Sequence, residues 1–146
     1  MPPVNPWKSY RQIATQTAPP GHLVLMLFDG ALRALDRALI GFTLAEVGER
    51  NMTIHNNLQH AVDIIRELNN SLDMEAGGEI AKTLRGLYAY FERRLLESNW
   101  RKSRLGIDEV LPMLRQLREA WFGMLNHGSP FLPAVDNWPA GQLTAP

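Results

Sequence analysis

The apolar residues of this chain recur every three or four positions, which is the spacing that places side chains on one face of an α-helix. The pattern predicts four helices, over about residues 21 to 42, 51 to 72, 78 to 98 and 107 to 125. No segment alternates apolar and polar residues as a half-exposed strand does. The second stretch shows an unbroken 4-3-4-3-4 spacing at Ile54, Leu58, Ala61, Ile65, Leu68 and Leu72.

This spacing is typical of helices that pack at small crossing angles. The links at residues 73 to 78 and 99 to 106 are short, and short links place successive helices antiparallel. The sequence therefore predicts an all-α fold, an antiparallel up-down four-helix bundle. Pro112 falls early in the fourth helix, which predicts that this helix starts late or is kinked there.

The two ends of the chain differ from the middle. Asn5-Pro6 is a cap followed by a proline at a first helical position, which predicts a short capping helix over residues 6 to 16. Its apolar side would consist of Trp7, Tyr10 and Ala14, with Ile13 beside them. After Leu125 the chain is rich in proline and glycine and is predicted to be irregular. We expect one helical-bundle domain over residues 1 to 126, including an N-terminal cap segment at 1 to 18, and a Pro-rich tail at 127 to 146.

The first predicted helix carries more apolar surface than one core-facing side needs. At 100° per residue its apolar side chains fill an arc of roughly 200°, whereas a one-sided helix needs somewhat over 100°. This helix either lies centrally, against two neighbours and the N-terminal segment, or it lines a groove for another chain's apolar helix. Both interpretations stay open on the sequence alone.

Composition narrows the class of protein. The 146 residues are 45% hydrophobic, and 15 basic residues balance 15 acidic ones, so no net positive charge attracts nucleic acid or anionic lipid. The N-terminus lacks the pattern of a signal peptide, and the longest apolar run is far short of the ~20 residues that cross a bilayer. We expect a cytoplasmic protein without membrane insertion. A basic cluster is interpreted as a solvated rim: Arg93, Arg94, Arg101, Lys102 and Arg104.

Groups for catalysis or metal binding are scarce. The chain has no cysteine, which excludes disulfides and thiolate metal sites, and its four histidines form no Glu-x-x-His or His-Glu-x-x-His motif. No serine lies in a Gly-x-Ser-x-Gly elbow, and Gly77-Gly78 has no Lys-Ser/Thr after it to make a phosphate loop. We therefore expect no metal, no cofactor and no enzymatic activity.

Several stretches resemble one known family. The sequence YRQIATQTAPP from Tyr10, followed by LVLMLFDGALRAL, is similar to the N-terminal signature of the FliS family of flagellin export chaperones. The stretch IIRELNNSLDMEAGGEIAKTLRGLYAYFERRLLESN and the later LRQLREAW are similar to the second half of that family. The resemblance covers about residues 10 to 125 in order. Phe28 stands where the family usually has tyrosine.

The resemblance implies a bundle that binds the C-terminal segment of flagellin in the cytoplasm. Binding would prevent premature polymerisation and aid delivery to the flagellar type III export apparatus, including its export-gate components. It also implies that the segment around Tyr10 caps the surface that flagellin uses. We expect Leu25, Phe28 and Leu32 as groove anchors, Tyr10 and Ile13 as a displaceable lid, and a monomer when the protein is free. The alternative is a bundle whose apolar face forms a homodimer or binds a partner other than flagellin.

Overall fold

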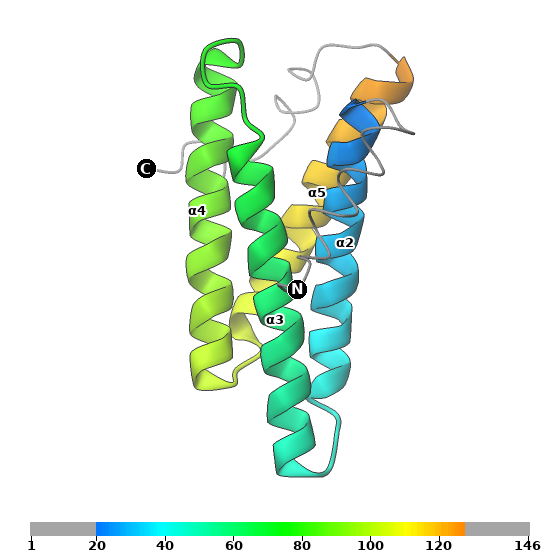
Figure 1. Ribbon diagram of the computed structural model, residues 1–146, viewed down its shortest axis with the longest axis vertical. Helices are drawn as coiled ribbons and strands as arrows, with labels where there is room; N and C mark the ends of the chain where they lie inside the picture. Colours follow the sequence, from blue (N-terminus) through cyan, green and yellow to red (C-terminus); the bar gives the residue numbers. More distant parts are fainter. Residues whose placement is uncertain (1–19, 128–146) are drawn as a thin grey trace, which may run out of the picture.

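The computed structural model describes residues 20 to 127, which form four helices (Figure 1). They are α2 (Pro20–Gly41), α3 (Val47–Asn70), α4 (Gly78–Arg101) and α5 (Leu105–His127). Successive helices run in opposite directions along the long axis, so the predicted antiparallel up-down bundle is confirmed. The predicted capping helix over residues 6 to 16 and the tail from residue 128 lie outside the described residues.

Helix α3 begins at Val47, four residues before the predicted start, because a side chain caps it there. The carboxylate of Glu46 accepts hydrogen bonds from the backbone N–H groups of Gly48, at 2.9 Å, and of Glu49. These bonds satisfy amides that have no partner inside the helix, and they favour the charged carboxylate. They accordingly hold the pKa of Glu46 below its usual value.

A tight turn joins α3 to α4. The Asp73 carboxylate accepts from the N–H groups of Glu75 and Ala76, at 3.1 and 2.9 Å, and the N–H of Gly77 donates to the Asp73 carbonyl at 2.8 Å. Gly78 has a φ of 54°, a left-handed conformation that glycine adopts without steric cost. The turn therefore reverses the chain within a few residues and sets α4 antiparallel to α3.

Helix α5 starts close against the end of α4. The Gly106 N–H donates to Ser98 Oγ at 2.8 Å, and a Cβ at Gly106 would lie 2.4 Å from both that oxygen and the Arg94 carbonyl. The helix is continuous from Leu105 through Pro112, so the predicted late start is wrong. Pro112 lies on the exposed side, where water can satisfy the Asp108 carbonyl that loses its amide partner.

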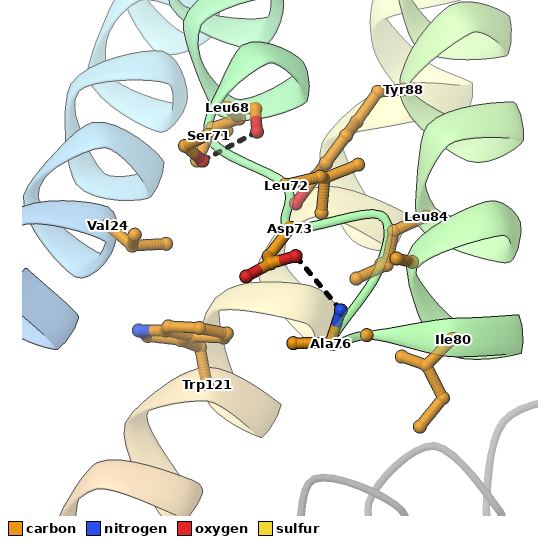
Figure 2. Close-up of a pocket in the computed structure, with 12 residues that line it drawn as sticks. Val24, Leu68, Ser71, Leu72, Asp73, Ala76, Ile80, Leu84, Tyr88 and Trp121 are labelled. Carbon is orange, nitrogen blue, oxygen red and sulfur yellow. Dashed lines mark hydrogen bonds between the residues drawn. The ribbon is translucent and has the colours of Figure 1, made fainter.

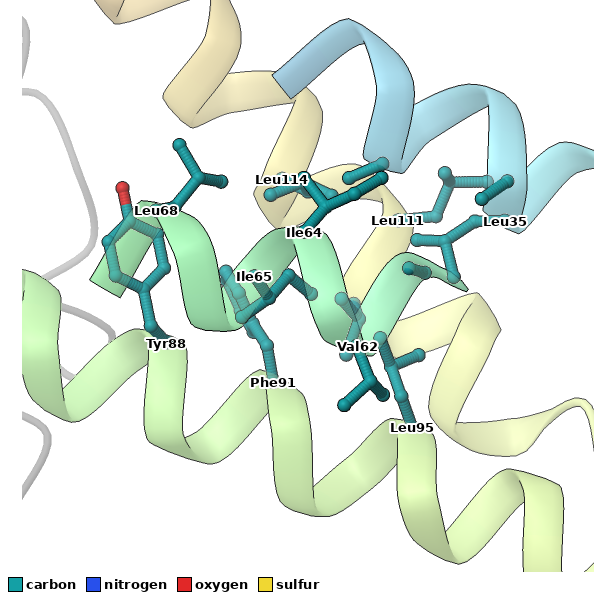
Figure 3. Close-up of a cluster of buried hydrophobic side chains, with 14 of the residues drawn as sticks. Leu35, Val62, Ile64, Ile65, Leu68, Tyr88, Phe91, Leu95, Leu111 and Leu114 are labelled. Atoms are coloured by element: carbon teal, nitrogen blue, oxygen red, sulfur yellow. The ribbon is translucent and has the colours of Figure 1, made fainter. Parts of the chain in front are cut away.

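The core runs along the axis of the bundle (Figure 3). Helices α2 and α4 each pack against α3 and α5, and the apolar seams predicted from the spacing meet between them. Phe28 and Phe91 are the largest of the fully buried side chains, and in Figure 3 Phe91 of α4 points toward Ile65 of α3. Each such side chain contributes about 1.5–3 kcal/mol by leaving water.

The wide apolar arc of α2 is largely accounted for by two neighbours. Leu27, Ala31, Ala34, Leu35 and Ala38 are buried where α2 packs on α3 and α5. This supports the interpretation of a central helix for most of the arc. One edge and the first two turns remain half-exposed, and the first turns lie beside the candidate site.

Candidate functional site

The predicted seam is not covered equally along its length. From the middle of the bundle to the α4–α5 turn the seam positions are buried. Near the α3–α4 turn, Leu72, Ile80 and Trp121 remain half-exposed. At this end of the bundle an apolar groove of about 510 Å³ opens (Figure 2). It is lined by Val24, Leu68, Ser71, Leu72, Asp73, Ala76, Gly77, Ile80, Ala81, Leu84, Tyr88 and Trp121.

The groove lies between two pairs of helices. In Figure 2, Val24 of α2 and Trp121 of α5 lie on one side, across from Leu84 and Ile80 of α4. The indole N–H of Trp121 donates to the Gly21 carbonyl at 2.8 Å, which joins the end of α5 to the first turn of α2. This bond holds the flat ring as a wall of the groove and gives its polar edge a partner.

The polar groups of the groove are already engaged or neutral. Asp73 accepts from the turn amides described above, and the Ser71 hydroxyl donates to the Leu68 carbonyl at 2.7 Å. Burial raises the pKa of the Tyr88 hydroxyl, so this group stays an uncharged phenol. The groove therefore offers apolar walls rather than a charged or reactive group.

The chemistry of the site is that of binding. Within residues 20 to 127 no group of three or more His, Cys, Asp or Glu side chains is placed to hold a metal ion. A concave apolar surface with few polar groups suits the apolar side chains of a peptide or helix. None of the described helices has the length and hydropathy needed to cross a bilayer.

The residues predicted as groove anchors lie near this site, but the groove's described lining includes none of them. Phe28 is only 2% exposed and belongs to the core, so a partner reaches it only by separating α2 from its neighbours. Leu25 and Leu32 are half-buried and lie on the edge of α2 that faces α5, on the same side as Asp29, which accepts from Arg118 at 2.9 Å. The predicted lid residues Tyr10 and Ile13 lie outside the described residues.

Sequence reasoning placed Leu72 in the seam of the second helix, but it assigned neither Leu72 nor Ile80 and Trp121 to a site. Their spacing is the same as that of buried core residues, and spacing does not show which positions of a seam are left exposed by the neighbouring helices. One signal was available in the sequence. In an up-down bundle, the end of the last helix lies at the same end as the turn between the second and third predicted helices. A large tryptophan ring therefore lies near a turn whose two glycines, Gly77 and Gly78, have no side chains to pack against it.

Comparison with known proteins identifies a family. The family described as "Flagellar protein FliS" matches residues 3 to 127. The chain is 40% identical over 119 residues to the flagellar secretion chaperone FliS of Salmonella typhimurium, covering 78% of this chain and 85% of that protein. It is 32% identical over 117 residues to the FliS chaperone of Bacillus subtilis (80% and 84%), and 31% identical over 121 residues to FliSB of Pseudomonas aeruginosa (80% and 93%).

Proposed function

This chain belongs to the FliS family of flagellar secretion chaperones, a chaperone family rather than an enzyme family, and from that premise we propose that its client is the C-terminal segment of flagellin. The protein binds this segment in the cytoplasm, prevents its premature polymerisation and aids its delivery to the flagellar type III export apparatus. The observation that carries the proposal is the apolar groove at the end of the bundle where α3 joins α4.

The mechanism is masking of apolar surface. A client segment without structure of its own orders on the bundle, and its apolar side chains enter the groove between Trp121 and Ile80. Burial of each large side chain contributes about 1.5–3 kcal/mol, which offsets the entropy lost on ordering. Removal of the same side chains from solvent keeps them from other flagellin subunits. No nucleotide or metal is needed.

The half-exposed edge of α2 extends the site. We propose that the client also contacts Leu25 and Leu32, whereas Phe28 supports them from the core. The resemblance implies that the segment around Tyr10 caps the surface that flagellin uses, and we propose that Tyr10 and Ile13 act there as the lid that the client displaces. If so, the double change Tyr10→Ala with Ile13→Ala removes a competitor and raises client affinity, measured by calorimetric titration.

The groove is tested by two changes of the same residue type. Ile80→Asp puts a carboxylate on the half-exposed wall of the groove, and a charge buried there without a partner is costly. Affinity for a synthetic peptide of the flagellin C-terminal segment should fall at least tenfold. Ile40→Asp is the control, because Ile40 is 61% exposed and lies near the other end of α2. The Ile40→Asp variant should bind the peptide with wild-type affinity.

Two further results bear on the proposal. An unchanged affinity in Ile80→Asp, with both variants folded by circular dichroism, would show that the client binds elsewhere. Sedimentation of the free protein addresses the alternative function: a stable dimer that ignores the peptide indicates a homodimer interface instead. A monomer that forms a one-to-one complex supports the chaperone proposal.

A further inference from the structure

The outer face of α4 carries the most exposed tryptophan of the described residues. Trp100 is 83% exposed, and Leu96, one turn before it, is 36% exposed. Residues three or four apart share one side of a helix, so these two continue a line that runs along α4. We call this line the outer face of α4, and it consists of Lys82, Arg85, Ala89, Arg93, Leu96 and Trp100.

The outer face points away from both the core and the groove. Glu92 pairs with Arg66 on the side of α4 toward α3, and Arg94 pairs with Glu109 at 3.0 Å on the side toward α5. The groove is lined by the opposite side of the helix, through Leu84 and Tyr88. All six residues of the outer face are exposed. A partner on this face therefore leaves the groove open to a client.

The outer face is positively charged although the whole chain is neutral. The three glutamates of α4 are engaged: Glu79 pairs with Lys82 at 3.3 Å, Glu92 with Arg66, and Glu97 with Arg94 at 3.3 Å and Arg101 at 3.9 Å. Among residues 20 to 127, no carboxylate lies within ion-pair distance of Arg85 or Arg93. The Arg93 guanidinium instead lies 5.3 Å from the centre of the Tyr90 ring.

We propose that the outer face of α4 is a second docking surface, which binds an acidic amphipathic helix of a partner other than the client. Its carboxylates would pair with Arg85 and Arg93, and an apolar side chain would cover Leu96 and Trp100. Ala89 lies between the two arginines and leaves room for close approach. Tryptophan and arginine are the residue types that most often dominate binding energy at protein interfaces.

The charge and the distribution of apolar residues favour this occupant over others. A second copy of the chain on the same face would place like charges opposite each other. A membrane surface requires an apolar face along the helix, whereas here the apolar residues are confined to Leu96 and Trp100 at one end. From Lys82 to Trp100 the face is ~27 Å long, enough for a partner helix of about five turns.

The first test uses full-length protein and a designed probe. The probe is an 18-residue helical peptide with glutamates spaced to meet Arg85 and Arg93 and leucines spaced to meet Trp100. The matched probe carries lysine in place of each glutamate. With 5-fluorotryptophan in the protein, the acidic probe should shift the fluorine resonance of Trp100 and leave that of Trp121 in place. The resonances are assigned with Trp100→Phe and Trp121→Phe.

Charge reversal supplies the second test. The double change Arg85→Glu with Arg93→Glu should lower the affinity for the acidic probe at least tenfold. The control is Arg33→Glu with Arg37→Glu, on the exposed side of α2, which should leave that affinity unchanged. The Arg85/Arg93 variant should keep wild-type affinity for the flagellin peptide, which separates this proposal from the proposed function. In cells that lack their own copy of the gene, it should restore swimming less well than the Arg33/Arg37 variant.

Several results would overturn the proposal. Equal binding of the lysine probe would remove the charge argument, and a shift of Trp121 would place the probe in the groove. A Trp100 shift with anionic phosphatidylglycerol vesicles that exceeds the shift with the peptide would favour a membrane surface. A concentration-dependent Trp100 shift of the protein alone would favour self-association. Full swimming of the Arg85/Arg93 variant would show that the face has no partner in the cell.

Discussion

His60 lies half-buried on α3, within the electrostatic reach of Arg33 and Arg37 of α2. Burial lowers the pKa of His60, because the imidazolium loses hydration that the neutral ring does not need. Asp63 opposes this shift, and the two arginines add to it. The folded protein therefore holds the proton of His60 less well than the unfolded chain does.

This difference predicts how stability depends on pH. Above about pH 6.5, the usual pKa of histidine, both states have a neutral His60 and the group has no effect. As the pH falls below that value, the unfolded chain takes up a proton first, so the free energy of unfolding decreases. From pH 7.5 to pH 5.5, the urea concentration at the midpoint of unfolding should fall. The fall should be larger in the wild type than in the His60→Gln variant. Equal drops would contradict the assignment to His60.

Phe28 shows what a residue-level prediction from sequence leaves undetermined. Its ring belongs to the apolar arc of α2, as expected, but the side of the arc that it occupies packs against the core. The sequence pattern measures the width of the arc and not which neighbours cover it. Phe28→Asp would therefore report on folding, and Ile80→Asp or Leu25→Asp would report on client binding.

At the level of elements, the approach of α5 to α4 depends on Gly106. A Cβ there would lie 2.4 Å from Ser98 Oγ and the Arg94 carbonyl, and the carbonyl cannot rotate away. Gly106→Ala should therefore destabilise the protein by about 1–3 kcal/mol through forced displacement of the two helices. The measurement is the free energy of unfolding in urea.

Gly123, in the same helix, is the matched control. A Cβ at Gly123 meets no atom of the described structure within 4 Å, so alanine adds only its better helix propensity. Gly123→Ala should stabilise the protein by about 0.5–1 kcal/mol. Opposite signs for the two changes would confirm that Gly106 is needed for close packing and not for flexibility. The same sign for both would contradict this.

Most helix positions could be predicted from the sequence, and the exceptions have local causes. The seam of α3 was predicted from its spacing, and Ile54, Leu58 and Ile65 are buried as expected. The start of α3 was placed too late, because the capping bond from Glu46 carries no apolar signal. The late start of α5 was inferred from Pro112, but the structure tolerates this proline on an exposed surface.

At the level of the whole molecule, the apolar seam residues are buried more completely at one end of the bundle than at the other. Near the α4–α5 turn, the seam residues Leu95 and Ile107 are fully buried, whereas near the α3–α4 turn Leu72 and Trp121 are half-exposed. The candidate site could not be predicted from spacing, because the apolar spacing does not show that α4 and α5 diverge toward the end where α3 joins α4 (Figure 1). Within residues 20 to 127 no side chain fills this groove, and apolar surface left unburied adds nothing to stability, so its presence agrees with a surface that a client covers.

A side chain that fills the groove should therefore raise stability and lower function. Ala76 lies in the turn at the edge of the groove, and Ala76→Leu directs extra apolar surface into it. We expect a gain of about 0.5–1.5 kcal/mol in the free energy of unfolding, together with a severalfold loss of affinity for the flagellin peptide. Ala45→Leu, at an exposed position in the α2–α3 turn, is the control and should change neither quantity appreciably. A stabilised Ala76→Leu protein that still binds the peptide with wild-type affinity would show that the groove is a packing defect and that the client uses another surface.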